Sequence, residues 1–288
     1  MPMMTPDLAK IRVEGDGLEC PDVGSWAETK YRLISLYDEL FATGMKHKWD
    51  RRVYIDLYAG SGYSRIRGTE IVLKASPVLA LTVSNPFDKY IFCEEDDRLL
   101  AALKERVQRI APAADVTYVH GKCDAKISEI CRSIPRGSAN CKVLSLCIVD
   151  PFDFGIKFAS IQALSKVFMD FVVLLAVGMD AARNYDHYVD GEHKKIDEAL
   201  GNTEWRDRWK VARDGRKKFI NFLAEEFAGS MKSLNYLDQN LDQMKLVRSN
   251  EKNLPLYYLA LFSRHTTAYQ FWDQVLKYGT DQSSFTWE

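Results

Sequence analysis

The sequence has no apolar run long enough to cross a membrane. Its longest strongly apolar run, Phe171 to Val177, is far shorter than the roughly 20 residues of a transmembrane helix. The first ten residues lack the apolar core of a signal peptide. Neither sign of charge predominates, because 39 lysines and arginines nearly balance 40 acids. The net charge of −1 therefore indicates neither a nucleic-acid nor a membrane partner, and we expect a cytoplasmic protein by default.

The cysteines and glycines also lack several familiar patterns. None of the six cysteines forms a Cys-x-x-Cys pair or a metal-site spacing, and we expect no metal centre. Cys93 and Cys147 lie in apolar segments and are interpreted as core thiols. The phosphate loop G-x-x-x-x-G-K-[ST] is absent, and Tyr58 replaces the first glycine of a dinucleotide G-x-G-x-x-G motif.

What the chain does have is a regular alternation of strands and helices from Val53 onward. Five apolar strands are expected at about 53–57, 90–93, 116–119, 143–149 and 171–176, with helical periodicity between them. This order predicts an α/β fold with a doubly wound, mainly parallel sheet. Two later strands, about 244–247 and 256–262, are expected as an antiparallel pair at the sheet edge, giving seven strands.

The domain organisation follows from where this alternation starts and changes. Residues 1–24 are expected to be an irregular N-terminal arm, and a capping box at Ser25 opens the first helix. Residues 25–288 then form one domain. It includes a long connection at about 63–74 and a helical insertion at about 179–232.

The most informative motif is the end of the first parallel strand. Asp56 ends the strand and can bind a cationic ligand group, and small residues follow that let a backbone approach a ligand closely. This turn comprises Tyr58, Ala59, Gly60, Ser61 and Gly62. Ligands of doubly wound sheets bind at this edge, although a tight strand–helix turn is the alternative. The pattern resembles motif I of class I S-adenosylmethionine (SAM) methyltransferases, which implies SAM as the cofactor.

The next two strands also end in polar residues. Glu94 follows the second strand and can accept hydrogen bonds from both ribose hydroxyls of the cofactor. Asp124, beside the small Cys123, can accept from the adenine amino group. A helix N-cap is an equally good interpretation of Asp124.

The fourth strand ends in Asp150, Pro151 and Phe152, which are candidate catalytic residues. This end resembles the [DNS]-P-P-[YFW] motif of amino methyltransferases. The resemblance implies that the polar side chain and a prolyl carbonyl bind the acceptor NH2 while the aromatic ring stacks on the target base. The chain departs from the motif, because it has one proline and Asp153 stands where the aromatic belongs. Asp150 and Pro151 could also simply terminate the strand.

From about Ser25 the chain resembles the three-Cys-motif partner proteins. The matching features are the Lys30-Tyr31 helix, the strand and turn at 54–60, the segment 75–77, the end of the fourth strand and the strand–helix at 259–272. The resemblance implies a class I methyltransferase fold and a separate cysteine-motif partner related to radical-SAM enzymes. It supplies no substrate.

One local charge cluster hints at nucleic acid. Residues 206–218 contain seven bases and two acids, interleaved with Trp205 and Trp209. A solvated helix face with buried tryptophans is the alternative.

The leading interpretation of the whole chain is a SAM-dependent methyltransferase, with N-methylation of a nucleic acid or a partner-presented substrate. The alternative is a catalytically silent subunit of the same fold that binds the cysteine-motif protein.

Overall fold

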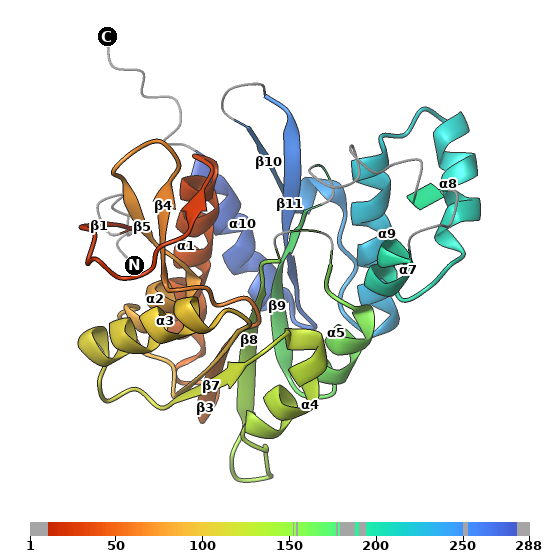
Figure 1. Cartoon of the computed structure of the whole chain (residues 1–288). Coiled ribbons are helices and arrows are strands. Elements are labelled where there is room, and N and C mark those ends of the chain that lie inside the picture. The colour runs from red at the N-terminus through yellow and green to blue at the C-terminus, as the bar shows by residue number, and fades with distance from the viewer. Residues whose placement is uncertain are drawn as a thin grey trace.

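A seven-stranded sheet runs through the centre of the protein in this computed structural model, which describes residues 11–151, 153, 155–176, 178, 188–189, 194–249 and 253–280 (Figure 1). The strand order is β10-β11-β9-β8-β3-β6-β7. Five neighbouring strands are parallel, and β11 pairs antiparallel with both β9 and β10. The strand bounds are β3 Arg51–Asp56, β6 Lys89–Glu94, β7 Val116–His120, β8 Val143–Val149, β9 Met169–Leu175, β10 Lys245–Arg248 and β11 Pro255–Phe262. The predicted fold class and the antiparallel edge pair are confirmed.

Helices cover both faces of this sheet, because successive strand residues point to opposite sides. Val53 and Ile55 belong to one buried cluster, whereas Tyr54 belongs to the other. The Tyr54 face packs against α1, α3 and α10, and the other face packs against α4, α5 and α7 to α9. The helix bounds are α1 Ala27–Met45, α2 Ser76–Leu81, α3 Asp97–Ile110, α4 Cys123–Ser133, α5 Phe158–Leu164, α7 Lys195–Leu200, α8 Trp205–Asp214, α9 Phe219–Ser233 and α10 Thr266–Thr280, with a short 3-10 turn, η2, at Leu241–Gln243.

A second, four-stranded sheet corrects two predictions. The segment expected to be an irregular arm contains β1 (Arg12–Val13) and β2 (Asp22–Val23), and the long connection is a hairpin of β4 (Tyr63–Ile66) and β5 (Val72–Lys74). These strands pair in the order β1-β5-β4-β2 over a small apolar cluster. Two-residue strands carry too little periodicity to be recognised in a sequence.

The region after β9 is helical where the structure describes it. Helices α7, α8 and α9 lie between 195 and 233, whereas 179–187 and 190–193 of the predicted insertion fall outside the described residues. Among the helices described, none combines the length and the apolar character needed to span a bilayer.

Candidate functional site

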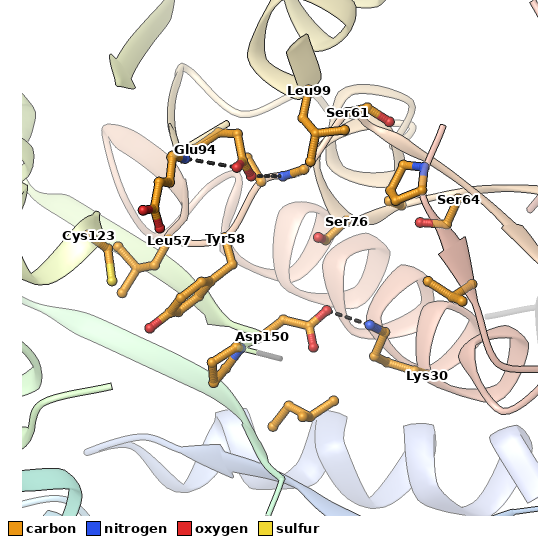
Figure 2. Close-up of a pocket in the computed structure, with 18 of the residues that line it drawn as sticks. Lys30, Leu57, Tyr58, Ser61, Ser64, Ser76, Glu94, Leu99, Cys123 and Asp150 are labelled. Atoms are coloured by element: carbon orange, nitrogen blue, oxygen red, sulfur yellow. Dashed lines mark hydrogen bonds and ion pairs between the residues drawn. The ribbon is translucent and has the colours of Figure 1, made fainter. Parts of the chain in front are cut away.

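A cavity of about 600 Å³ opens at the carboxyl ends of β3, β6, β7 and β8. The sheet topology brings most of the predicted site residues to its wall, although they come from four separate strand ends (Figure 2). They are Tyr58, Ala59, Gly60, Ser61, Glu94, Cys123, Asp124, Asp150 and Pro151. Asp56 and Gly62 do not line the cavity, and Phe152 lies outside the described residues.

The glycine turn needs both of its glycines, for different reasons. Gly60 has a φ of +60°, and a Cβ added there would meet nothing within 4 Å, so this backbone borders open space. Gly62 has a φ of +82°, and its Cβ would stand 2.8 Å from a methyl group of Val78. Gly62 therefore permits packing beneath the turn, whereas Gly60 leaves the cavity wall open.

Glu94 locks the turn to the neighbouring strand. Its Oε2 accepts the Gly60 N–H at 2.7 Å, and its Oε1 accepts the N–H groups of Glu95 and Asp96, both at 2.8 Å. A carboxylate offers about four lone-pair positions, and three are used. The sequence predicted that Glu94 would accept two ribose hydroxyls, but the geometry leaves room for one on Oε2.

Asp56 lies beneath the turn rather than in its wall. It is fully buried, and its Oδ1 accepts the Tyr58 N–H at 3.1 Å. Burial raises the pKa of Asp56 to about 7, against the opposing effects of Ser76 and the Tyr58 N–H. In this arrangement Asp56 orders the turn, and its predicted contact with a cationic ligand group stays a prediction.

Cys123 and Asp124 form the wall at the β7 end. Burial raises the pKa of Cys123 to about 11, so at neutral pH it is a small, protonated thiol beside the Tyr58 ring. Asp124 Oδ1 accepts the Ser160 hydroxyl at 2.6 Å and the Lys157 N–H at 3.3 Å. These bonds tie α4 to the start of α5 and occupy one of the two Asp124 oxygens.

Asp150 is held by a lysine that the pattern of strand ends does not reveal. Lys30 extends from α1 and places its Nζ 2.5 Å from Asp150 Oδ2, with side-chain exposures of 6% and 13% (Figure 2). Burial alone would lower the pKa of Lys30, but Asp150 and Tyr31 outweigh it and raise the pKa above its usual value. Lys30 is therefore a fixed cation and no proton acceptor. A signal was available, since Lys30 lies on the buried helix face of Leu33, Ile34 and Tyr37, where Asp38 is the other charged residue.

The remaining wall comes from the start of α1 and the small sheet, which sequence reasoning also missed. Its lining includes Val23, Trp26, Tyr31, Ser64 and Arg67. The Tyr31 hydroxyl and Ser64 Oγ lie 3.0 Å apart, and the Lys30 Nζ lies 4.5 Å from the centre of the Tyr31 ring. This side of the cavity is thus aromatic and polar.

Arg106 of α3 fastens this wall to the glycine turn. Its guanidinium binds both Asp16 carboxylate oxygens at 2.7 and 2.8 Å, and it donates to the Glu19 carbonyl at 2.9 Å and the Ser61 carbonyl at 2.7 Å. The side chain is 1% exposed. Arg106 thereby ties the segment before β2 to the turn after β3.

The predicted nucleic-acid segment, residues 206–218, does not reach the cavity. Trp205 and Trp209 are buried, and Trp209 packs against Phe219 and Phe222. Five of the seven bases face carboxylates, in the pairs Arg206–Asp197, Arg208–Glu226, Lys210–Asp207, Arg213–Asp214 and Lys217–Glu225. The segment therefore has the character of a solvated helix face with core tryptophans.

The sheet order and the cavity at its carboxyl edge define an α/β fold with a candidate ligand site where doubly wound sheets bind ligands. The chain is similar to Trm1 from Pyrococcus horikoshii, solved with S-adenosyl-L-methionine, at 10% identity and a TM-score of 0.46 over 92% of this chain and 64% of that one. It is also similar to the O-methyltransferase TomG from Streptomyces achromogenes, at 13% identity and a TM-score of 0.41 over 79% of each chain. No family model and no curated protein matches the sequence.

Proposed function

We propose that the protein is a SAM-dependent methyltransferase. The observation that carries this proposal is the turn at Gly60, held open against a cavity and clamped by Glu94. An open glycine turn beside an acidic strand end suits an adenosine-bearing ligand, because the backbone can approach the ligand and the carboxylate can accept a ribose hydroxyl. The 600 Å³ cavity is within the range of small-molecule sites.

The two ends of the cavity suit two parts of SAM. Glu94 Oε2 would accept one ribose hydroxyl, and Asp124, next to the small Cys123, would accept from the adenine amino group. Asp56 would keep the turn in shape from below. When bound, SAM supplies an electrophilic methyl group on a sulfonium.

The acceptor group would approach from the side of Asp150 and Lys30. Asp150 Oδ2 is taken by Lys30, which leaves Oδ1 to accept a hydrogen bond from an acceptor N–H. Such a bond orients the nitrogen lone pair toward the methyl group. An acceptor nitrogen on a nucleic acid or on a partner-presented substrate fits this arrangement. Methylation of either acceptor nitrogen needs neither Asp150 nor Lys30 to act as a strong base.

Calorimetry with SAM and S-adenosylhomocysteine tests the proposal. The wild type should bind with a micromolar Kd, roughly −8 kcal/mol. Glu94→Gln should weaken binding by about 1–3 kcal/mol, because a charged acceptor is lost. Glu105→Gln is the matched control, since its exposed side chain pairs with Arg109 on α3 and does not line the cavity, and it should bind like the wild type. Absence of heat with both ligands in the wild type would contradict the proposal.

A second candidate is a catalytically silent subunit of the same fold. The observation favouring it is the Lys30–Asp150 ion pair, which occupies one oxygen of the candidate catalytic carboxylate. On this proposal the chain is a partner of a three-Cys-motif protein related to radical-SAM enzymes. Its signature is SAM binding without methyl transfer to any acceptor, together with co-purification of a cysteine-motif partner. Methyl transfer by the isolated chain would exclude it.

A further inference from the structure

Three segments meet at the opposite edge of the sheet, where β3, β8 and β9 begin: residues 46–51, 139–142 and 166–168. We call them the amino-edge patch. The Asp50 N–H donates to the Lys142 carbonyl at 3.0 Å, and the Lys142 N–H donates to Asp50 Oδ2 at 2.7 Å. The Trp49 and Phe168 ring centres are 5.3 Å apart. These contacts join the three segments into one surface.

The patch exposes aromatic surface. Phe168 is 57% exposed, and among the described residues it is the one aromatic in the set of exposed large hydrophobic side chains. Val167 beside it is 41% exposed, and Trp49 is half-buried. A hollow of about 540 Å³ is lined by residues 46–50, 139, 140 and 142, Trp49 among them.

The charge of the patch is strongly positive. It contains Lys46, Lys48, Arg51, Lys142 and Lys166 against one carboxylate, Asp50. All five cationic side chains are exposed. Within the part of the chain that the structure describes, none of them forms an ion pair, although Lys46 Nζ donates to Asn85 Oδ1 at 2.7 Å. Asp50 is already bonded to the Lys142 backbone. The segment 206–218, which the sequence suggested as a nucleic-acid site, differs in exposure and in pairing. Trp205 and Trp209 beside its bases are buried, and most of its bases are paired with acids.

We propose that the amino-edge patch binds single-stranded nucleic acid. Proteins that bind single strands combine a cationic groove that follows the phosphates with aromatic rings on which bases stack. The patch has unpaired cations beside an exposed Phe168 and a half-buried Trp49. A protein interface would favour a different composition, because lysine is depleted at such interfaces.

The patch lies at the far end of the strands from the candidate cofactor cavity. β8 alone has seven residues, and at roughly 3.3 Å per residue this separates the two edges by on the order of 20 Å. A single-stranded nucleic acid bound to the patch therefore lies outside the cavity. The proposal does not depend on SAM binding.

Fluorescence anisotropy with labelled 15-nucleotide U-RNA and T-DNA, measured from 50 to 200 mM KCl, tests the proposal. The wild type should bind, with affinity falling as salt rises. Lys48→Ala with Lys142→Ala should reduce the slope of log affinity against log salt by about 1.4 and the affinity by roughly 10- to 30-fold. Phe168→Ala should weaken binding about ten-fold with an unchanged slope, because stacking is lost and charge is not.

Matched controls stand elsewhere on the molecule. Lys210→Ala with Lys217→Ala removes two charges from the segment 206–218, and Leu254→Ala truncates a side chain that is 54% exposed, like Phe168. Both controls should bind like the wild type. The proposal is overturned if the wild type shows no binding at 50 mM KCl, or if the controls lose as much affinity as the patch variants.

Discussion

Replacing Lys30 by methionine tests the contact that joins α1 to the end of β8. The Lys30 Nζ is 2.5 Å from Asp150 Oδ2, and both side chains are largely buried. Removing one partner of a buried pair leaves the other charge without compensation, which typically costs about 3–5 kcal/mol. Methionine retains most of the volume of lysine, so the loss should come from charge and not from a cavity. We expect Lys30→Met to lower the free energy of unfolding by about that amount.

Urea unfolding at pH 7 and pH 9 measures this effect. The folded pKa of Lys30 is raised, so its contribution is fully present below the unfolded value of about 10.4 and is lost as pH rises through the higher folded value. The difference between wild type and variant should therefore be equal at pH 7 and pH 9. Adding Asp150→Asn removes the uncompensated charge, and the double variant should be more stable than Lys30→Met alone.

Lys122→Met is the control, because Lys122 is 74% exposed and its pairing with Glu95 at 3.5 Å is solvent-accessible. Its cost should lie within about 0.5 kcal/mol. The reasoning is refuted if Lys30→Met is as mild as this control, or if the double variant is the least stable of the set.

Three further predictions concern the turn and its supports. Gly60→Ala should cost about 1–2 kcal/mol of stability because of the positive φ. It should also weaken SAM binding in calorimetry at least ten-fold, because the added methyl group enters open space beside the cavity, and unchanged affinity would refute this. Asp56→Asn should be more stable than the wild type at pH 8 by about 2–4 kcal/mol, because the raised folded pKa of Asp56 makes wild-type stability fall between about pH 4 and 7. In urea unfolding, this gain in the free energy of unfolding should vanish near pH 4. A gain that does not depend on pH would contradict the prediction. Arg106→Met should lower the Tm and speed amide exchange in residues 12–23, whereas Asp16→Asn, which keeps an acceptor for Arg106, should do both less; equal effects would count against a role for the buried cation.

Local sequence patterns were sufficient for the central sheet. β8 and β9 are buried along their whole length and appear in the sequence as apolar runs interrupted only by Ser145 and Asp170, as expected for parallel strands with helices on both faces. Parallel strands also carry their carboxyl ends to one edge, so the polar residues at four strand ends could be assigned to one site from the sequence alone. Glu94 and Asp150 follow directly from this rule.

The features that sequence patterns did not reveal depend on contacts between distant segments. Lys30 and Asp150 are 120 residues apart, and Arg106 and Asp16 are 90 apart. Arg106 shares the buried face of α3 with Leu103 and Val107, but nothing local identifies Asp16 as its partner. The small sheet was missed for the same reason, since β1 finds its partner β5 some 60 residues later.

The two basic regions of the chain illustrate how pairing decides what a charge count means. In residues 205–218 the sequence places two tryptophans among seven bases, but the amphipathic period of α8 turns Trp205 and Trp209 inward. Acids from α7, α8 and α9 pair with five of the bases. In the amino-edge patch the bases come from three separate segments, so no window of sequence contains them all. Their exposure beside Phe168 follows from the common start of β3, β8 and β9 at one edge. A cluster of bases thus indicates a binding surface when the fold leaves its charges without acidic partners. The arrangement of the strands shows which of the two basic clusters meets this condition.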